Sequence, residues 1–236
     1  KEFKEVSGLL CDEYSQKVFW GYIKAQKGNI CEDILYSING TYFNELTKEK
    51  RAGAFLDCGA YKGESVIDYM RFFGEECKIY AFEPDSCNYK DLAHKMKNRT
   101  NIICLNKGCY SSEKILSFDS QGDMSSSLQE NGKECVEVTT IEKIVGNEKI
   151  AFIKMDIEGA ELEALKGARN VIERDMPVLA ISAYHRQEDL ITLLPYINNF
   201  RSIDETEEYK LYLRHHGVGS TELVIYAIPR KKDVGM

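Results

Sequence analysis

Short apolar runs alternate with amphipathic stretches along most of the chain after about residue 50. Each run is bounded by polar residues or glycine, which is the pattern of a buried strand. These runs predict strands at residues 54–57, 78–82, 101–106, 150–156, 177–184, 210–216 and 222–228. The stretches between them carry apolar residues at helical spacing, as in Leu92 and Met96, which predicts helices. The alternation predicts a mostly parallel α/β sheet with helices on both faces.

Two parts of the chain depart from this alternation. Residues 15–23 have helical spacing with an aromatic face. Residues 1–50 are therefore expected to form a helical cap beside a main domain of residues 51–236. Farther along, two apolar runs on either side of a polar loop predict a hairpin, and this loop, residues 120–133, is a candidate lid.

The end of the first predicted strand carries a turn with two glycines. Asp57 ends the strand, and Gly59 and Gly63 lie in the turn that leads into a helix expected from about Lys62. Glycine lets the backbone turn sharply and lets a ligand approach closely. In open α/β sheets the carboxyl ends of the strands line the crevice that binds ligands. Because the glycine spacing is not G-x-G-x-x-G, the turn disfavours a dinucleotide.

A second acid, Glu83, ends the next predicted strand roughly 20 residues after the turn, where acids accept hydrogen bonds from ribose hydroxyls. With the small pair Gly59-Ala60 and the acid Asp57, it suits a nucleoside ligand that has a cationic amino group and no phosphate. S-adenosylmethionine is such a ligand. The residues of the turn and the strand ends that are expected to bind this cofactor are Asp57, Gly59, Ala60, Tyr61, Gly63, Ser65 and Glu83.

Composition excludes several classes of protein. The chain has 31 Lys and Arg residues against 38 Asp and Glu residues, a net charge of −7, so a nucleic-acid partner with its basic stripe is not expected. No apolar run reaches the roughly 18 residues of a membrane span, and no signal-peptide pattern opens the chain, so a cytoplasmic protein is expected. None of the eight cysteines forms a C-x-x-C pair, which favours reduced thiols over a metal or redox site.

Three motifs, in this order, resemble the FkbM-type methyltransferase family. They are Asp57-Cys58-Gly59-Ala60-Tyr61-Lys62-Gly63, then Phe82-Glu83-Pro84, then residues 153–168 with the run Asp156-Ile157-Glu158-Gly159-Ala160-Glu161. The last run is the most specific, and the resemblance covers roughly residues 51–228. It implies a Rossmann-like class I S-adenosylmethionine-dependent methyltransferase fold with the final strand antiparallel. It also implies O-methylation, commonly of a sugar hydroxyl.

The implied fold places the strand ends after Asp57, Asp156 and Tyr184 along one edge of the sheet. Asp156 is then a candidate for the base that takes the acceptor's proton, and it could instead hold the donor's amino group, orient the acceptor or bind a divalent ion. His185 is the other candidate base, because histidine titrates near neutrality. The residues expected at the acceptor are Glu158, Arg186, Arg214 and His215. Two carboxylates, Asp156 and Glu158, are not evidence for a metal ion, and none is expected.

Each assignment has a plainer alternative. Glu158 could serve only the electrostatics of a helix start, and Arg186 and Arg214 could lie on solvated faces. His215 could be a surface residue of an edge strand, and His185 a hydrogen-bonded structural histidine. The expected function is O-methylation of a saccharide, a glycan or a glycosylated natural product. The alternatives are a methyltransferase for a small phenol or amine and a catalytically silent nucleoside-binding module.

Overall fold

The computed structural model of the protein describes residues 2–27, 35–49, 51–119, 127–128, 134–217 and 221–232. The chain divides into two compact units, Lys50–Pro177 and the combination of Lys1–Glu49 with Val178–Met236. The loop predicted as a lid lies outside the described residues apart from Ser127 and Leu128. Within the described part of the chain, no helix has both the length and the apolar character that crossing a bilayer requires.

The unit Lys50–Pro177 is built on four parallel strands. Their order across the sheet is β8, β1, β2, β3. The strands are β1 (Ala54–Cys58), β2 (Ile79–Phe82), β3 (Ile102–Leu105) and β8 (Ile150–Met155). Every residue of β1, β2 and β8 is buried, which explains why these segments read as apolar runs without alternation. These four predicted strands are confirmed.

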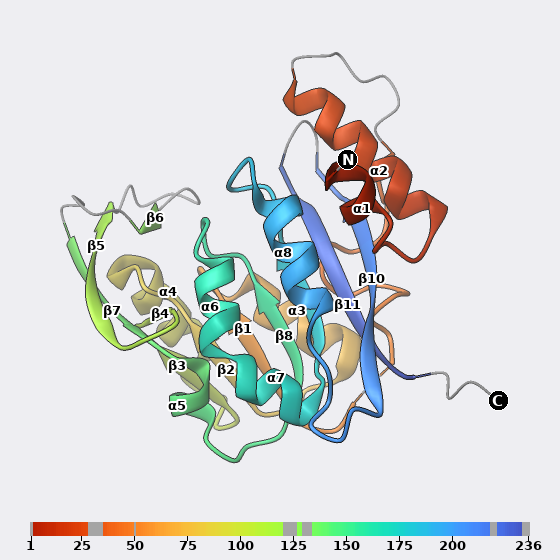
Figure 1. Cartoon of the computed structure of the whole chain (residues 1–236). Coiled ribbons are helices and arrows are strands. Elements are labelled where there is room, and N and C mark those ends of the chain that lie inside the picture. The colour runs from red at the N-terminus through yellow and green to blue at the C-terminus, as the bar shows by residue number, and fades with distance from the viewer. Residues whose placement is uncertain are drawn as a thin grey trace. The chain divides into compact units, whose positions relative to one another are not determined.

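Helices cover both faces of this parallel sheet. In Figure 1, α6 and α7 lie in front of it and α3 and α4 lie behind it. The helices are α3 (Glu64–Phe73), α4 (Ser86–Met96), α6 (Glu161–Gly167) and α7 (Arg169–Asp175). The first begins later than the expected Lys62, because Gly63 has a left-handed backbone with φ of 86° that a right-handed helix cannot include.

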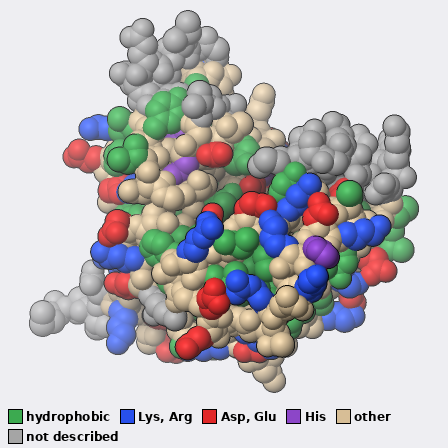
Figure 2. All heavy atoms as spheres, turned by 180° about the vertical axis from the view of Figure 1, so that it is seen from behind, with side chains coloured by type: hydrophobic (Ala, Val, Ile, Leu, Met, Phe, Trp, Pro, Cys, Tyr) green, Lys and Arg blue, Asp and Glu red, His purple; other side chains and the backbone are tan. Residues whose placement is uncertain are grey.

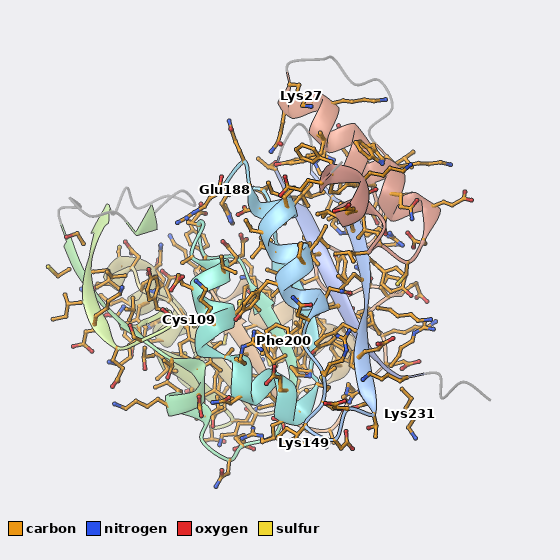
Figure 3. All side chains as sticks on the ribbon, viewed as in Figure 1. Lys27, Cys109, Lys149, Glu188, Phe200 and Lys231 are labelled. Atoms are coloured by element: carbon orange, nitrogen blue, oxygen red, sulfur yellow. The ribbon has the colours of Figure 1, made fainter. Side chains whose placement is uncertain are left out.

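A second, smaller sheet follows β3 in this unit. The predicted hairpin is confirmed, since β5 (Lys114–Asp119) and β7 (Glu134–Thr139) pair antiparallel. The other members of the sheet are β4 (Gly108–Cys109) and β6 (Ser127–Leu128), and the short helix α5 (Ile141–Val145) follows. Cys109, labelled in Figure 3, ends β4 and is buried as a free thiol.

The other unit combines the two ends of the chain. Its strands β9 (Val178–Ser182), β11 (Leu223–Lys231) and β10 (Glu207–His215) form an antiparallel set in that order. Its helices are α1 (Glu2–Ser7), α2 (Glu13–Gln26) and α8 (Asp189–Asn198). The first residues therefore belong with this C-terminal part, where α2 packs on β10. The parallel strands and the antiparallel final strand confirm the predicted α/β fold class.

Candidate functional site

Three chain segments meet at the carboxyl edge of the parallel strands. Cys58, the last residue of β1, is paired with the last residue of β2 on one side and the last residue of β8 on the other. Gly59, Glu83 and Asp156 directly follow these three residues. Glu83 therefore lies on one side of Gly59 and Asp156 on the other, at the same edge of the sheet. Lys149, labelled in Figure 3, precedes β8 and marks the opposite, amino edge. Glu83 and Asp156 therefore both lie at the carboxyl edge of the parallel strands.

The turn after β1 is held by its own backbone. The N–H groups of Gly59 and Ala60 donate to the Phe82 carbonyl at 3.0 and 2.9 Å, and the Gly63 N–H donates to the Ala60 carbonyl at 2.7 Å. Gly59 has φ of 80°, and a Cβ there would lie 1.9 Å from the Asp156 carbonyl oxygen. Only glycine fits this position, because any side chain would collide with the backbone after β8.

Glu83 is buried beside the turn, with 6% of its surface exposed. One carboxylate oxygen accepts from the Tyr61 N–H at 2.8 Å and the other from the Asp85 N–H at 2.9 Å. Burial raises the pKa of Glu83 from 4.5 to about 7, although these two hydrogen bonds act in the opposite direction. The carboxyl group therefore changes its protonation state close to neutral pH.

Asp57 is fully buried and contacts two side chains rather than solvent. One carboxylate oxygen accepts from the Ser65 hydroxyl at 2.5 Å, and the other lies 3.1 Å from the Lys154 ammonium. Burial raises the pKa of Asp57, while the charge of Lys154 opposes that shift. For Lys154, burial lowers the pKa, but the charges of Asp57 and Asp156 outweigh it and the net pKa is raised. The 3.1 Å contact makes the two groups a buried ion pair.

Lys154 is the residue of this site to which the sequence analysis assigned no role. It lies in β8 and is 2% exposed. A lysine inside an otherwise apolar strand is itself a signal, because a buried ammonium needs a carboxylate or several carbonyl groups as partners. Hydrophobic patterning marks the strand as buried but does not name those partners.

Asp156 and Glu158 lie in the turn between β8 and α6, and both are half-buried. The Asp156 N–H donates to the Cys58 carbonyl at 3.1 Å, which extends the β1–β8 pairing by one residue. Glu158 and Gly159 have φ of 54° and 91°, so the chain reverses sharply here. The Ile157 N–H donates to the Glu161 carboxylate at 2.9 Å, which fixes the turn to the start of α6.

The four remaining predicted site residues belong to the other unit. Arg214 binds Asp12 at 2.7 Å and also donates to the Ser15 hydroxyl at 2.7 Å. His215 is fully buried, so the alternative of a surface residue on an edge strand is wrong. Its Nε2 lies 2.8 Å from the Thr221 carbonyl, and burial lowers its pKa.

Two of these residues lie in the segment after β9. Arg186 is exposed at its side chain, and its N–H donates to the Asp189 carboxylate at 2.8 Å, at the start of α8. His185 is half-buried, and its ring centroid lies 4.2 Å from that of Tyr184. In Figure 3 the labelled Glu188 marks the loop that leads into α8.

The family model described as the Methyltransferase FkbM domain matches residues 57–217. The crystal structure of the methyltransferase FkbM from Methylobacillus flagellatus KT is similar with a TM-score of 0.77 and 26% identity. The similarity covers 96% of this chain and 58% of that one, so the chain spans somewhat more than half of that relative's length. Both findings agree with the family resemblance and with the predicted Rossmann-like fold.

Two further solved structures are more remote. Fibrillarin from Aeropyrum pernix, solved with natively bound S-adenosyl-L-methionine, has 15% identity and a TM-score of 0.44 over 76% of this chain and 67% of its own. A SAM-dependent methyltransferase from Aquifex aeolicus has 14% identity and a TM-score of 0.39 over 95% and 97%. No curated protein sequence matches this chain significantly.

Proposed function

Because the chain belongs to the FkbM methyltransferase family, we propose that it is an S-adenosylmethionine-dependent O-methyltransferase that acts on a hydroxyl group of a saccharide or glycan. The observation that carries the proposal is the hydrogen bond between the turn after β1 and the Glu83 carboxylate, donated by the Tyr61 N–H. Both groups lie at the carboxyl edge of β1 and β2. Ligands of open α/β folds bind at this edge. The saccharide is proposed from the family resemblance.

The donor set of this edge fits a nucleoside. Each Glu83 oxygen accepts one backbone N–H and keeps a further lone pair, so the carboxylate can also accept from two ribose hydroxyls. Gly59 and Ala60 present no bulky side chain at the turn, which leaves the backbone open to close approach. When bound, S-adenosylmethionine would supply a methyl group activated by its sulfonium centre.

We assign the cofactor-binding residues in two groups. Tyr61, Glu83 and Asp156, together with the small residues of the turn, are proposed to face the donor. Asp57 and Ser65, which are hydrogen-bonded to each other, are proposed to support the turn from beneath.

Proton transfer is proposed to fall to Asp156 or His185. Either side chain can accept the proton of an attacking hydroxyl, a contribution of about 10²–10⁴-fold in rate. The larger part of the acceleration is expected from positioning, because methyl transfer is a direct displacement between two bound molecules. Glu158 and the exposed Arg186 are proposed to hydrogen-bond the acceptor. Arg214 and His215 lie in β10, where Arg214 binds Asp12 and the His215 ring contacts the Thr221 carbonyl. We propose that they support acceptor binding indirectly.

Methyl transfer from isotopically labelled S-adenosylmethionine to a panel of acceptors tests this function. We expect labelled product with saccharides or glycan extracts, and none with small phenols or amines. Turnover confined to a phenol or an amine would contradict the saccharide proposal. Donor binding without turnover on any acceptor, and without effect of Asp156→Ala or His185→Ala, would show a silent nucleoside-binding module instead.

A further inference from the structure

The Lys154 ammonium lies against three acceptor oxygens at the end of β1. Its Nζ lies 3.1 Å from the Asp57 carboxylate, 2.6 Å from the Gly59 carbonyl oxygen and 3.4 Å from the Cys58 carbonyl oxygen. The two carbonyl oxygens accept hydrogen bonds from this ammonium, and the contact with Asp57 is an ion pair. The shortest of the three contacts is to the glycine turn rather than to the carboxylate.

We propose that Lys154 is a positioning residue for the donor site, which acts by fixing the peptide group of Gly59. The N–H of Gly59 is held by the Phe82 carbonyl, and its carbonyl is held by Lys154, so both ends of this residue are restrained before a ligand arrives. A turn that is already ordered loses less conformational entropy when it binds a ligand. This inference rests on the proposed function, because it names the residue that prepares the same site.

The charges around Lys154 agree with this role. Its ammonium interacts electrostatically with Asp57 of β1 and with Asp156 after β8, and it stabilises the charged form of Glu83 after β2. One cation therefore serves acidic groups from three neighbouring strand ends. Asp57 is its buried partner, so the acid of the glycine motif is assigned to holding Lys154 in place rather than to contacting the donor.

Two variants separate positioning from simple charge balance. Lys154→Met leaves the Asp57 carboxylate buried without its cation, so the variant is expected to lose thermal stability. Asp57→Asn/Lys154→Met removes both charges and is expected to recover most of that loss. In both variants the Gly59 carbonyl lacks its donor, so both should bind S-adenosylhomocysteine at least about tenfold more weakly than the wild type, a change of about 1.4 kcal/mol.

A matched control uses a lysine whose ion pair lies at the other edge of the sheet. Lys78 precedes β2 and binds Glu148 at 2.6 Å. Lys78→Met should leave the affinity for S-adenosylhomocysteine unchanged within twofold. Wild-type affinity in the double variant, together with the recovery of stability, would overturn the positioning role and leave Lys154 as a charge-balancing residue only.

Hydrogen exchange in the free protein provides a readout without any ligand. In the double variant the Gly59 and Ala60 amides should exchange at least about tenfold faster, whereas the amides of β10 should be unchanged. Equal exchange at the turn in the variant and the wild type would contradict the inference. Hydrogen exchange also distinguishes the two proposals. If the wild type fails to bind S-adenosylhomocysteine, the donor site is refuted. Faster exchange at the turn in the double variant would still support the role of Lys154.

Discussion

Glu83 changes its protonation state close to neutral pH. Burial raises its pKa from 4.5 to about 7, so the folded protein retains a proton that the unfolded chain releases at lower pH. The stabilisation from this neutral form is fully present below pH 4.5 and is lost as the pH rises through 7. The whole shift corresponds to about 3 kcal/mol.

The pH dependence of unfolding tests this residue. In urea denaturation between pH 5 and pH 8, Glu83→Gln should lose less free energy of unfolding than the wild type, because the glutamine has no proton to release. Glu188→Gln, at an exposed position before α8, should reproduce the slope of the wild type. Equal slopes for Glu83→Gln and the wild type would show that Glu83 does not titrate in this range.

The turn between β1 and α3 is the element on which the site depends most. In Gly59→Ala, the new Cβ would lie 1.9 Å from the Asp156 carbonyl oxygen, and φ of 80° is unfavourable for alanine. We expect a loss of at least about 2 kcal/mol in the free energy of unfolding, and at least a tenfold loss of affinity for S-adenosylhomocysteine. Chemical denaturation and calorimetry measure the two effects.

Gly167→Ala is the matched control for this element. Gly167 is the last residue of α6, and a Cβ there would lie 2.0 Å from the Tyr110 carbonyl oxygen. A comparable loss of stability is therefore expected. The turn after β1 is not involved, and the folded variant should keep its affinity. If both variants lost affinity to the same degree, the effect of Gly59→Ala would be one of general destabilisation.

The start of α2 depends on Asp12, which also binds Arg214. Its carboxylate accepts from the Ser15 N–H at 2.6 Å as the helix cap, and it lies 2.7 Å from the guanidinium. Asp12→Ala should therefore lower the free energy of unfolding by about 1–2 kcal/mol, because a cap alone contributes about 1 kcal/mol. Glu13→Ala, one residue on, should cost less than half of this in thermal denaturation. A loss in Asp12→Ala no larger than that in Glu13→Ala would contradict a specific contribution of the cap and the ion pair.

Elements and strand ends could be predicted from the sequence, because apolar runs identify buried strands and glycines identify the turn. The partners of buried polar groups could not, since Lys154 pairs with residues far away in the chain. His215 illustrates a signal that was available: it continues the alternation of buried residues Tyr209, Leu211 and Leu213 along β10. The helix α3 begins at Glu64 rather than at about Lys62, because helical spacing does not reveal the left-handed backbone of Gly63.

Across the whole molecule, the sequence carries a net charge of −7. On the face drawn in Figure 2, the acidic and basic side chains of the described residues are interspersed. Among the described residues on this face, no large area carries a single sign of charge that would attract a polyanion.

Calorimetric titration of the whole chain with S-adenosylhomocysteine tests the central claim most directly. If the Gly59 turn and Glu83 form a nucleoside site, the wild type should bind one equivalent with a micromolar dissociation constant. Glu83→Ala should bind at least about tenfold more weakly, because the ribose hydroxyls lose their acceptor. No heat of binding at high micromolar ligand, or an affinity of Glu83→Ala equal to that of the wild type, would contradict the claim.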